Sequence, residues 1–159
     1  MSHTYANIYI HCIFSTKERK PCIAADRMAD LFAYLCGIAR SEGFTLISAR
    51  GTANHVHLLL VLPATLSIST AVQMLKGSSS RWLGKGFAWQ EGYGAFSVSP
   101  SQVATVKRYI AGQEEHHRKR SFEEEFTEML RKCGLEYDPR LYLVDISGVP
   151  TGLVVFGVR

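Results

Sequence analysis

Apolar and polar positions alternate most clearly along ANHVHLLLVLP, residues 53–63, and this alternation predicts a β-strand. The even-numbered positions from Val56 to Leu62 are all apolar, whereas the odd-numbered set begins with His55 and His57. Because successive side chains of a strand point to opposite faces, the two imidazoles share one face. The pattern raises the question of why a short apolar strand carries two histidines side by side.

Three further segments combine aromatic, β-branched and other apolar residues in the short runs that are typical of strands. They are YANIYIHCIFST (5–16), FTLISAR (44–50) and AFSVS (95–99). The turn GTAN between 44–50 and the histidine strand indicates a hairpin.

Apolar residues at helical spacing predict one helix between the first two strands and another before the last strand. The first follows Asp26, which is a suitable N-cap, and stops at Gly43. The second begins near Ser67, in LSISTAVQMLKGSSSRWLG. Two more helices are predicted after the last strand, over 101–120 and 121–134. The Ser-x-x-Glu spacing at the start of 121–134 indicates a capping box.

The order strand, helix, strand, strand, helix, strand is that of the split-βαβ, or ferredoxin-like, arrangement. We therefore predict an α+β fold in which an antiparallel sheet has both helices on one face. The other face of the sheet stays available for a ligand, and the two C-terminal helices follow. No internal repeat and no long linker interrupts the chain, which at 159 residues suits a single domain.

Composition narrows the class of protein only moderately. Hydrophobic residues make up 47% and charged residues 20%, a balance that argues against a disordered chain. The formal net charge of +4 is compatible with a nucleic-acid partner without indicating one. No apolar run reaches about 18 residues, and the N-terminal residues lack a signal-peptide pattern. The four cysteines lack CxxC spacing, so we expect reduced thiols and a cytoplasmic protein.

Two histidines at positions i and i+2 of a strand can reach one metal ion, and neutral imidazole suits Mn, Zn, Fe or Cu. The alternative is that one ring packs in the core through a backbone hydrogen bond while the other is solvated. His55 and His57 alone do not decide between these interpretations.

The segment 101–120 adds a second group of polar residues at helical spacing. Tyr109 and Gln113 are four residues apart and share a helix face, with His116 three residues further along. Basic residues flank them, which suits a phosphate ligand, although a solvated basic face explains the charge as well. These basic residues are Lys107, Arg108, Arg118, Lys119 and Arg120.

Several short motifs occur together, in an order and at distances that match one known family. They are NHVHLLL, QMLKGSSSRWL, WQEGYGAFSVS, YIAGQEEHH and SFEEEF. Together they resemble the single-tyrosine HUH transposases, the small enzymes of bacterial hairpin-ended insertion sequences. The resemblance runs from about Thr4 to Asp145, so we expect one transposase domain over 1–145. The apolar tail 146–159 is atypical of that family.

The resemblance implies roles for individual side chains. The HUH motif falls on His55, Val56 and His57, which makes the two histidines metal ligands. The nucleophilic tyrosine of the family falls on Tyr109 and its third metal ligand on Gln113. The resemblance also implies the ferredoxin-like fold and a homodimer in which the tyrosine helix often completes the partner's site. The implied substrate is single-stranded DNA with hairpin ends, cut beside the hairpin.

The implied chemistry agrees with these residue types. A free tyrosine has a pKa of about 10 and needs assistance to attack at neutral pH. Attack on a phosphodiester would leave a 5′-phosphotyrosine and a free 3′-OH without any need for ATP, and the chain has no P-loop motif. Two histidines and a glutamine form a neutral ligand set, so we expect activity with Mg²⁺ or Mn²⁺ and tighter binding of Mn²⁺.

Contacts with DNA are predicted from the segment KGSSSRW, whose hydroxyls and cations suit phosphate. Capping serines at a helix end are the alternative interpretation of this segment. Four rings are candidates for stacking on unpaired bases, although Trp89 and Phe96 also suit a core. The four rings are those of His11, Trp89, Tyr93 and Phe96. The predicted DNA-binding residues are Lys76, Ser78, Ser79, Arg81, Lys107 and Arg108.

Two other function classes fit parts of the pattern. A ferredoxin-like sheet can bind single-stranded nucleic acid without catalysis, although such modules carry aromatic residues where this strand carries histidines. A degenerate or domesticated transposase that only binds DNA belongs to this class. A metal-dependent hydrolase that uses the HxH pair would not need Tyr109. The substitution Tyr109→Phe therefore separates the classes.

Overall fold

The computed structural model describes residues 3–137, and the chain divides into two compact units. The first unit extends from Met1 to Glu114, and the second begins at Glu115. The predicted end of the domain at residue 145 and the tail 146–159 lie outside the described residues. Within residues 3–137, no helix is both long and apolar enough to cross a bilayer.

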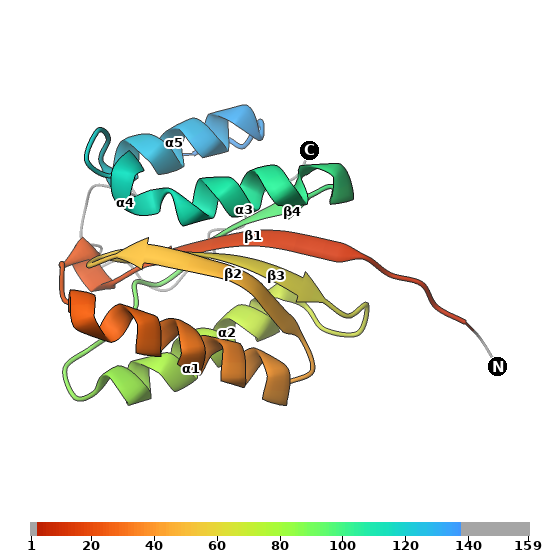
Figure 1. Cartoon of the computed structure of the whole chain (residues 1–159), viewed down its shortest axis with the longest axis horizontal. Coiled ribbons are helices and arrows are strands. Elements are labelled where there is room, and N and C mark those ends of the chain that lie inside the picture. Colours follow the sequence, from red (N-terminus) through yellow and green to blue (C-terminus); the bar gives the residue numbers. More distant parts are fainter. Residues whose placement is uncertain (1–2, 138–159) are drawn as a thin grey trace. The chain divides into compact units, whose positions relative to one another are not determined.

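The first unit contains a four-stranded antiparallel sheet with the spatial order β2-β3-β1-β4 (Figure 1). The strands are β1 Ile8–Ser15, β2 Thr45–Thr52, β3 His55–Leu62 and β4 Gly94–Val98. Helix α1 (Met28–Ser41) connects β1 to β2, and helix α2 (Ile68–Leu83) connects β3 to β4. Both helices lie on one face of the sheet (Figure 1). The ferredoxin-like α+β arrangement that the sequence predicts is thereby confirmed.

Local capping explains where these two helices begin. Helix α2 begins directly after Ser67, close to where the sequence predicts. Ser67 is its N-cap, and the Ser67 hydroxyl accepts a hydrogen bond from the Thr70 backbone N–H. The prediction that Asp26 caps α1 is wrong. Asp26 lies in a short 3-10 turn, Ala25–Arg27, that leads directly into α1. The carbonyl of Ala25 accepts the hydrogen bond of the Met28 backbone N–H, and Arg27 takes the N-cap position.

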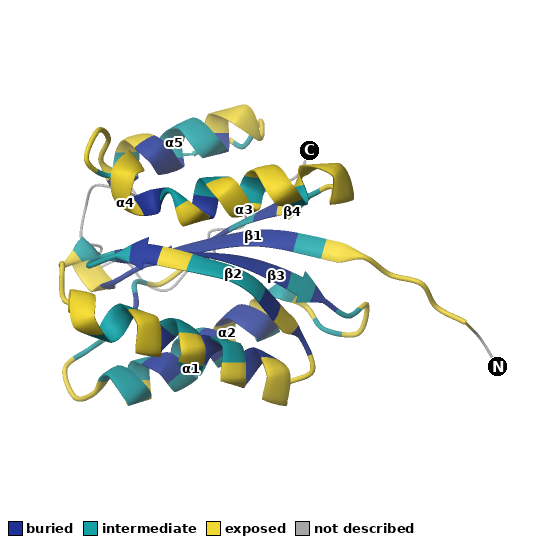
Figure 2. Ribbon diagram, in the orientation of Figure 1, coloured by how far each residue is buried: buried dark blue, intermediate teal, exposed yellow. Residues whose placement is uncertain are grey.

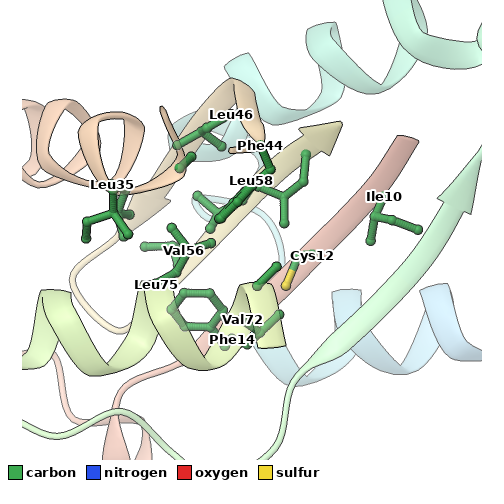
Figure 3. Packing of buried hydrophobic residues seen from close by; sticks show 14 of the residues in the cluster. Ile10, Cys12, Phe14, Leu35, Phe44, Leu46, Val56, Leu58, Val72 and Leu75 are labelled. Carbon is green, nitrogen blue, oxygen red and sulfur yellow. The ribbon is translucent and has the colours of Figure 1, made fainter. Parts of the chain in front are cut away.

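The apolar face of the sheet forms the main core against α1 and α2. Alternate residues of β1 and β3 point into this core, and the side chains of Val56, Leu58 and Leu60 are fully buried. Both helices turn their buried residues toward the sheet and their exposed residues outward (Figure 2). Figure 3 shows strand and helix residues interlocked in this cluster. Those labelled are Ile10, Cys12, Phe14, Leu35, Phe44, Leu46, Val56, Leu58, Val72 and Leu75.

The opposite face of the sheet carries helix α3 (Val103–Ala111), which contacts β2 and β3 (Figure 1). This face is therefore partly covered rather than fully open to a ligand. The helix predicted over 101–120 is interrupted, because α4 (Gln113–His116) is separated from α3 by a break at Gly112. Glycine has a low helix propensity, which explains why the break falls there.

Helix α5 (Phe122–Lys132) is the longest described element of the second unit. It begins with the predicted capping box, in which Ser121 and Glu124 each accept a hydrogen bond from the other's backbone N–H. Within this unit, His117 Nε2 lies 2.9 Å from Glu125 Oε2. Burial raises the pKa of Glu125 to about 7, so this carboxyl is partly protonated near neutral pH.

Candidate active site

Strand β3 places His55 and His57 next to each other on the face opposite the main core. Their ring centroids are 5.2 Å apart, their planes stand at 72°, and both side chains are fully buried. The alternate residues Val56 and Leu58 belong to the core, so the alternation along the strand is what pairs the histidines. The interpretation in which one of the two rings is solvated is wrong, because neither ring is exposed.

The Nδ1 atom of His55 is held by the hairpin turn that precedes β3. It lies 2.7 Å from Asn54 Oδ1 and 3.0 Å from Thr52 Oγ1, and the Thr52 hydroxyl itself donates to Asn54 Oδ1. Because an amide oxygen only accepts hydrogen bonds, Nδ1 carries the proton and donates it. The buried Nε2 atom is then the ring nitrogen that has a lone pair.

The Nδ1 atom of His57 is held by a third histidine. His11, on the neighbouring strand β1, places its Nε2 atom 3.0 Å from His57 Nδ1, and His11 is itself buried. Burial lowers the pKa of His11 to about 4, so its ring is neutral at neutral pH. The prediction that His11 stacks on DNA bases is wrong, because its ring packs inside the protein.

Helix α3 brings Tyr109 alongside this histidine group within the same chain. The Tyr109 ring centroid is 5.9 Å from that of His57 and 6.0 Å from that of His11, and both pairs are edge-on. The Tyr109 side chain is half-buried, so it combines an anchored ring with access from solvent. The residues that the sequence marks for metal binding and for nucleophilic attack therefore lie close together.

Gln113, the first residue of α4, is fully buried directly after the break at Gly112. Its Nε2 atom donates a hydrogen bond to the Tyr109 backbone carbonyl at 3.4 Å. Gln113 and Tyr109 therefore stay in contact although the helix is interrupted between them. This contact uses the amide nitrogen, and the amide oxygen is the atom that could ligate a metal ion. The role of Gln113 as a ligand stays a prediction.

The histidine pair fits a divalent metal ion. Both rings use Nδ1 for a contact with the protein, so Nε2 is the atom through which each would coordinate. The two rings project from the same face of one strand and offer neutral nitrogen ligands, which suit Mn²⁺ and related ions. The arrangement is therefore compatible with a divalent metal site.

Gly51 allows β2 and β3 to approach each other closely beside the histidine pair. It lies opposite Val56 in the pairing register, and a Cβ atom at this glycine would be 2.3 Å from the carbonyl oxygen of His55. Such a contact is with backbone, which can give way only if the strand itself shifts. The backbone position of His55 therefore depends on the absence of a side chain at residue 51.

Two of the residues predicted to contact DNA, Lys76 and Ser79, make hydrogen bonds within the fold. Ser79 is fully buried, and its hydroxyl donates to the Leu75 carbonyl at 2.6 Å and accepts from Trp89 Nε1 at 2.9 Å. Lys76 Nζ donates to two backbone carbonyls of the loop before β4, at 2.6 and 2.9 Å. Ser79 therefore has no surface with which to touch a phosphate, and Lys76 fixes a loop.

The remaining predicted contacts lie at the surface to different degrees. Arg81, Lys107 and Arg108 are exposed, and Ser78 is half-buried. Among the aromatic candidates for base stacking, Trp89 and Phe96 are buried, so the core interpretation holds for both. Tyr93 is half-buried.

A ferredoxin-like sheet, a buried HxH pair and a helical tyrosine beside it together define the class of single-tyrosine HUH transposases. The family model described as "Transposase IS200 like" matches residues 4–113 of the chain. The chain therefore belongs to this transposase family, whose members act on DNA. The resemblance seen in the sequence motifs is thereby confirmed.

Curated relatives agree with this assignment. The transposase for insertion sequence element IS200 of Salmonella typhimurium is 26% identical over 124 residues, which cover 71% of this chain and 81% of the relative. The ISDra2 transposase TnpA of Deinococcus radiodurans is 29% identical over 114 residues, which cover 65% of this chain and 81% of the relative.

Solved structures have a similar fold. A putative transposase from Deinococcus radiodurans superposes with a TM-score of 0.58 at 26% identity, covering 71% of this chain and 95% of that one. A REP-associated tyrosine transposase, solved bound to a REP hairpin, superposes with a TM-score of 0.60. Its identity is 15%, with coverage of 100% of this chain and 96% of that one, so this likeness concerns the fold alone.

Proposed function

We propose that this transposase cleaves and rejoins single-stranded DNA beside hairpins and that Tyr109 becomes covalently bound to the DNA during the reaction. The observation that carries the proposal is the position of the Tyr109 ring, whose centroid is 5.9 Å from that of the buried His57. A hydroxyl nucleophile beside side chains that can hold a divalent ion is an arrangement suited to phosphoryl transfer.

In the proposed cleavage step, the Tyr109 oxygen attacks the phosphorus atom in line with its bond to the 3′ oxygen. The O–P bond to tyrosine forms as the P–O3′ bond breaks, the phenol proton passes to solvent, and the departing 3′ oxygen takes up a proton. The products are a 5′-phosphotyrosine and a free 3′-OH. Because the covalent link retains the phosphodiester, a DNA 3′-OH can reverse the step and rejoin strands without a nucleotide cofactor.

The metal site would be formed by His55 and His57 through Nε2 and by Gln113 through its amide oxygen. A divalent ion bound there neutralises charge on the scissile phosphate and helps to orient it. The Nδ1 contacts of both histidines support this role, because they fix which nitrogen of each ring can coordinate. Since all three ligands are neutral and two are nitrogens, Mg²⁺ and Mn²⁺ both support activity and Mn²⁺ binds more tightly.

Recognition of a DNA hairpin is supported by the family and by surface charge. A relative with the same fold has been solved bound to a REP hairpin. The exposed cations Arg81, Lys107 and Arg108 suit a phosphate backbone, and Ser78 adds a hydroxyl on the same helix as Arg81. The functional form is a homodimer, as the family resemblance implies.

The test compares wild type with Tyr109→Phe on a labelled single strand that carries a hairpin, in the presence of Mn²⁺. The wild type forms a protein–DNA adduct that survives denaturation. Tyr109→Phe lacks only the attacking oxygen and is expected to reduce adduct formation by about 10³-fold or more. Tyr34→Phe is the matched control, because it removes a phenol oxygen from α1, on the opposite face of the sheet.

Two outcomes would overturn this mechanism. DNA binding by the wild type without any adduct favours a non-catalytic nucleic-acid module. Cleavage that persists in Tyr109→Phe favours a hydrolase that activates water beside the histidine pair. Loss of the adduct in Tyr109→Phe, with an unchanged circular dichroism spectrum and an active Tyr34→Phe control, supports the tyrosine mechanism.

A further inference from the structure

His11 is a buried imidazole that neither the sequence motifs nor the proposed reaction uses. It stands on β1, where Ile13 faces His57 in the pairing register, so His11 approaches His57 diagonally across two neighbouring strands. Their Nε2 and Nδ1 atoms are 3.0 Å apart, within hydrogen-bond distance, and both rings are buried. Such a contact between two histidines places one hydrogen between two nitrogens.

The direction of this hydrogen bond decides what His57 can do. A neutral imidazole carries its proton on one nitrogen and a lone pair on the other. If Nδ1 of His57 donates to Nε2 of His11, then Nε2 of His57 has the lone pair that coordination needs. The opposite direction would put the proton of His57 on Nε2 and prevent that atom from acting as a ligand.

We propose that His11 is a positioning residue, which accepts the hydrogen bond from Nδ1 of His57 and thereby keeps Nε2 of His57 ready to bind a divalent cation. This inference rests on the proposed function, because it takes His57 as a metal ligand. The neighbouring ligand offers a parallel within the same site: His55 donates from Nδ1 to Asn54 Oδ1 at 2.7 Å. Partners of this kind fix the ring orientation and raise the basicity of metal-binding histidines.

His11 also links the histidine pair to the nucleophile. Its ring centroid lies 6.0 Å from that of Tyr109 in an edge-on arrangement and 6.3 Å from that of Phe96 on β4. One imidazole therefore contacts a proposed ligand through a hydrogen bond and packs against the proposed nucleophile through its ring. A purely apolar residue of similar size would keep the packing and lose the hydrogen bond, which makes the two effects separable.

The test measures Mn²⁺ affinity of the full chain without DNA, by titration against the electron paramagnetic resonance signal of free Mn²⁺. His11→Phe keeps a ring but removes the acceptor, and it is expected to weaken Mn²⁺ binding by about 10- to 100-fold. His11→Gln restores an acceptor oxygen near the former Nε2 position and is expected to stay within about threefold of wild type. His3→Phe is the matched control, because it removes an exposed imidazole and should leave the affinity unchanged.

A second measurement does not depend on any variant. Long-range proton–nitrogen correlation spectra of the ¹⁵N-labelled wild-type chain report which nitrogen of each histidine is protonated, and His57 is expected to carry its proton on Nδ1. A His57 protonated on Nε2, or a folded His11→Phe chain with wild-type Mn²⁺ affinity, overturns the proposal. If the wild type fails to bind Mn²⁺, or binding survives His55→Ala, the metal site itself is refuted, whereas the protonation of His57 still decides the role of His11.

Discussion

The two faces of the sheet are built from the same strands but bury different side chains: one face buries an apolar cluster, and the other buries three histidines among apolar residues such as Ile13 and Leu59. On one face, Val56 and Leu58 belong to an apolar cluster covered by α1 and α2. On the other, His55, His57 and His11 form a buried polar group beside α3. Because successive residues point to opposite faces, a register shift of one residue would turn the histidines toward the apolar core and the core leucines toward the site.

The difference shows that the two faces meet different physical requirements. Burial of an apolar side chain such as Leu58 lowers the free energy of the folded state and requires only a space that matches its shape. A buried imidazole loses hydration and needs a hydrogen-bond partner in return. His55 has Asn54 and His57 has His11, so the polar face is specified by particular partners. Substitutions on the polar face should therefore change activity, and those on the apolar face should change stability.

Among the substitutions that compare the two faces of the sheet, His57→Ala has the largest expected effect. This change removes a proposed ligand, and a bound ion contributes several kcal/mol of transition-state stabilisation, so adduct formation should fall by about 10³-fold. The rate of adduct formation on hairpin DNA with Mn²⁺ measures this loss. A variant that keeps wild-type activity while binding no Mn²⁺ would contradict the division between the faces.

The neighbouring substitution, Leu58→Ala, should act in the opposite way. Leu58 is fully buried in the core, and its truncation leaves a cavity between the sheet and the two helices. We expect the free energy of unfolding to fall by about 2–5 kcal/mol, measured by urea denaturation, while the activity per folded molecule stays near wild type. Loss of activity in a fully folded Leu58→Ala sample would show that the two faces are coupled.

Ser79→Ala tests a polar residue on the apolar side. The Ser79 hydroxyl accepts the Trp89 indole N–H, and its removal leaves a buried donor without that acceptor. We expect a loss of about 1–3 kcal/mol in the free energy of unfolding and no change in hairpin affinity. The contrasting variant is Arg81→Ala, which should weaken DNA binding and reduce its salt dependence without loss of stability. If a stable Ser79→Ala protein bound DNA more weakly, the prediction that Ser79 contacts DNA would be right after all.

The smallest expected effect is that of Ser67→Ala. Its hydroxyl caps α2, which covers only the apolar face, so the variant should lose about 1 kcal/mol in stability and no activity. Thermal unfolding measures the change. Ser99→Ala is the control, because Ser99 also precedes a helical turn but makes no side-chain cap bond, and equal losses in both variants would refute the capping argument.

The fold was predictable because its signals are local. The order of strands and helices follows from period-two and helical apolar patterns, and the capping box at Ser121 follows from chemistry that involves only the next few residues. The break at Gly112 was less evident, because a single glycine lowers helix stability without dictating where the helix ends.

The site was predictable only in part. The pairing of His55 and His57 is local to one strand. The contact of His57 with His11 joins two residues that are 46 positions apart, and it depends on the register between β1 and β3. No period within either segment reveals that register. For Ser79 a signal was present in the sequence: it lies four residues after Leu75 and continues the buried stripe of α2. The charges around it favoured a DNA contact and obscured that stripe.

Gly51 has a consequence for attempts to engineer this enzyme toward new DNA targets. The protein β-hairpin formed by β2 and β3 is an obvious place for substitutions, because it borders the histidine pair and has a short turn. At residue 51, however, even a methyl group would meet the His55 carbonyl at 2.3 Å and push the backbone of that histidine away. Mutant libraries of this hairpin should therefore keep the glycine fixed and place their diversity elsewhere.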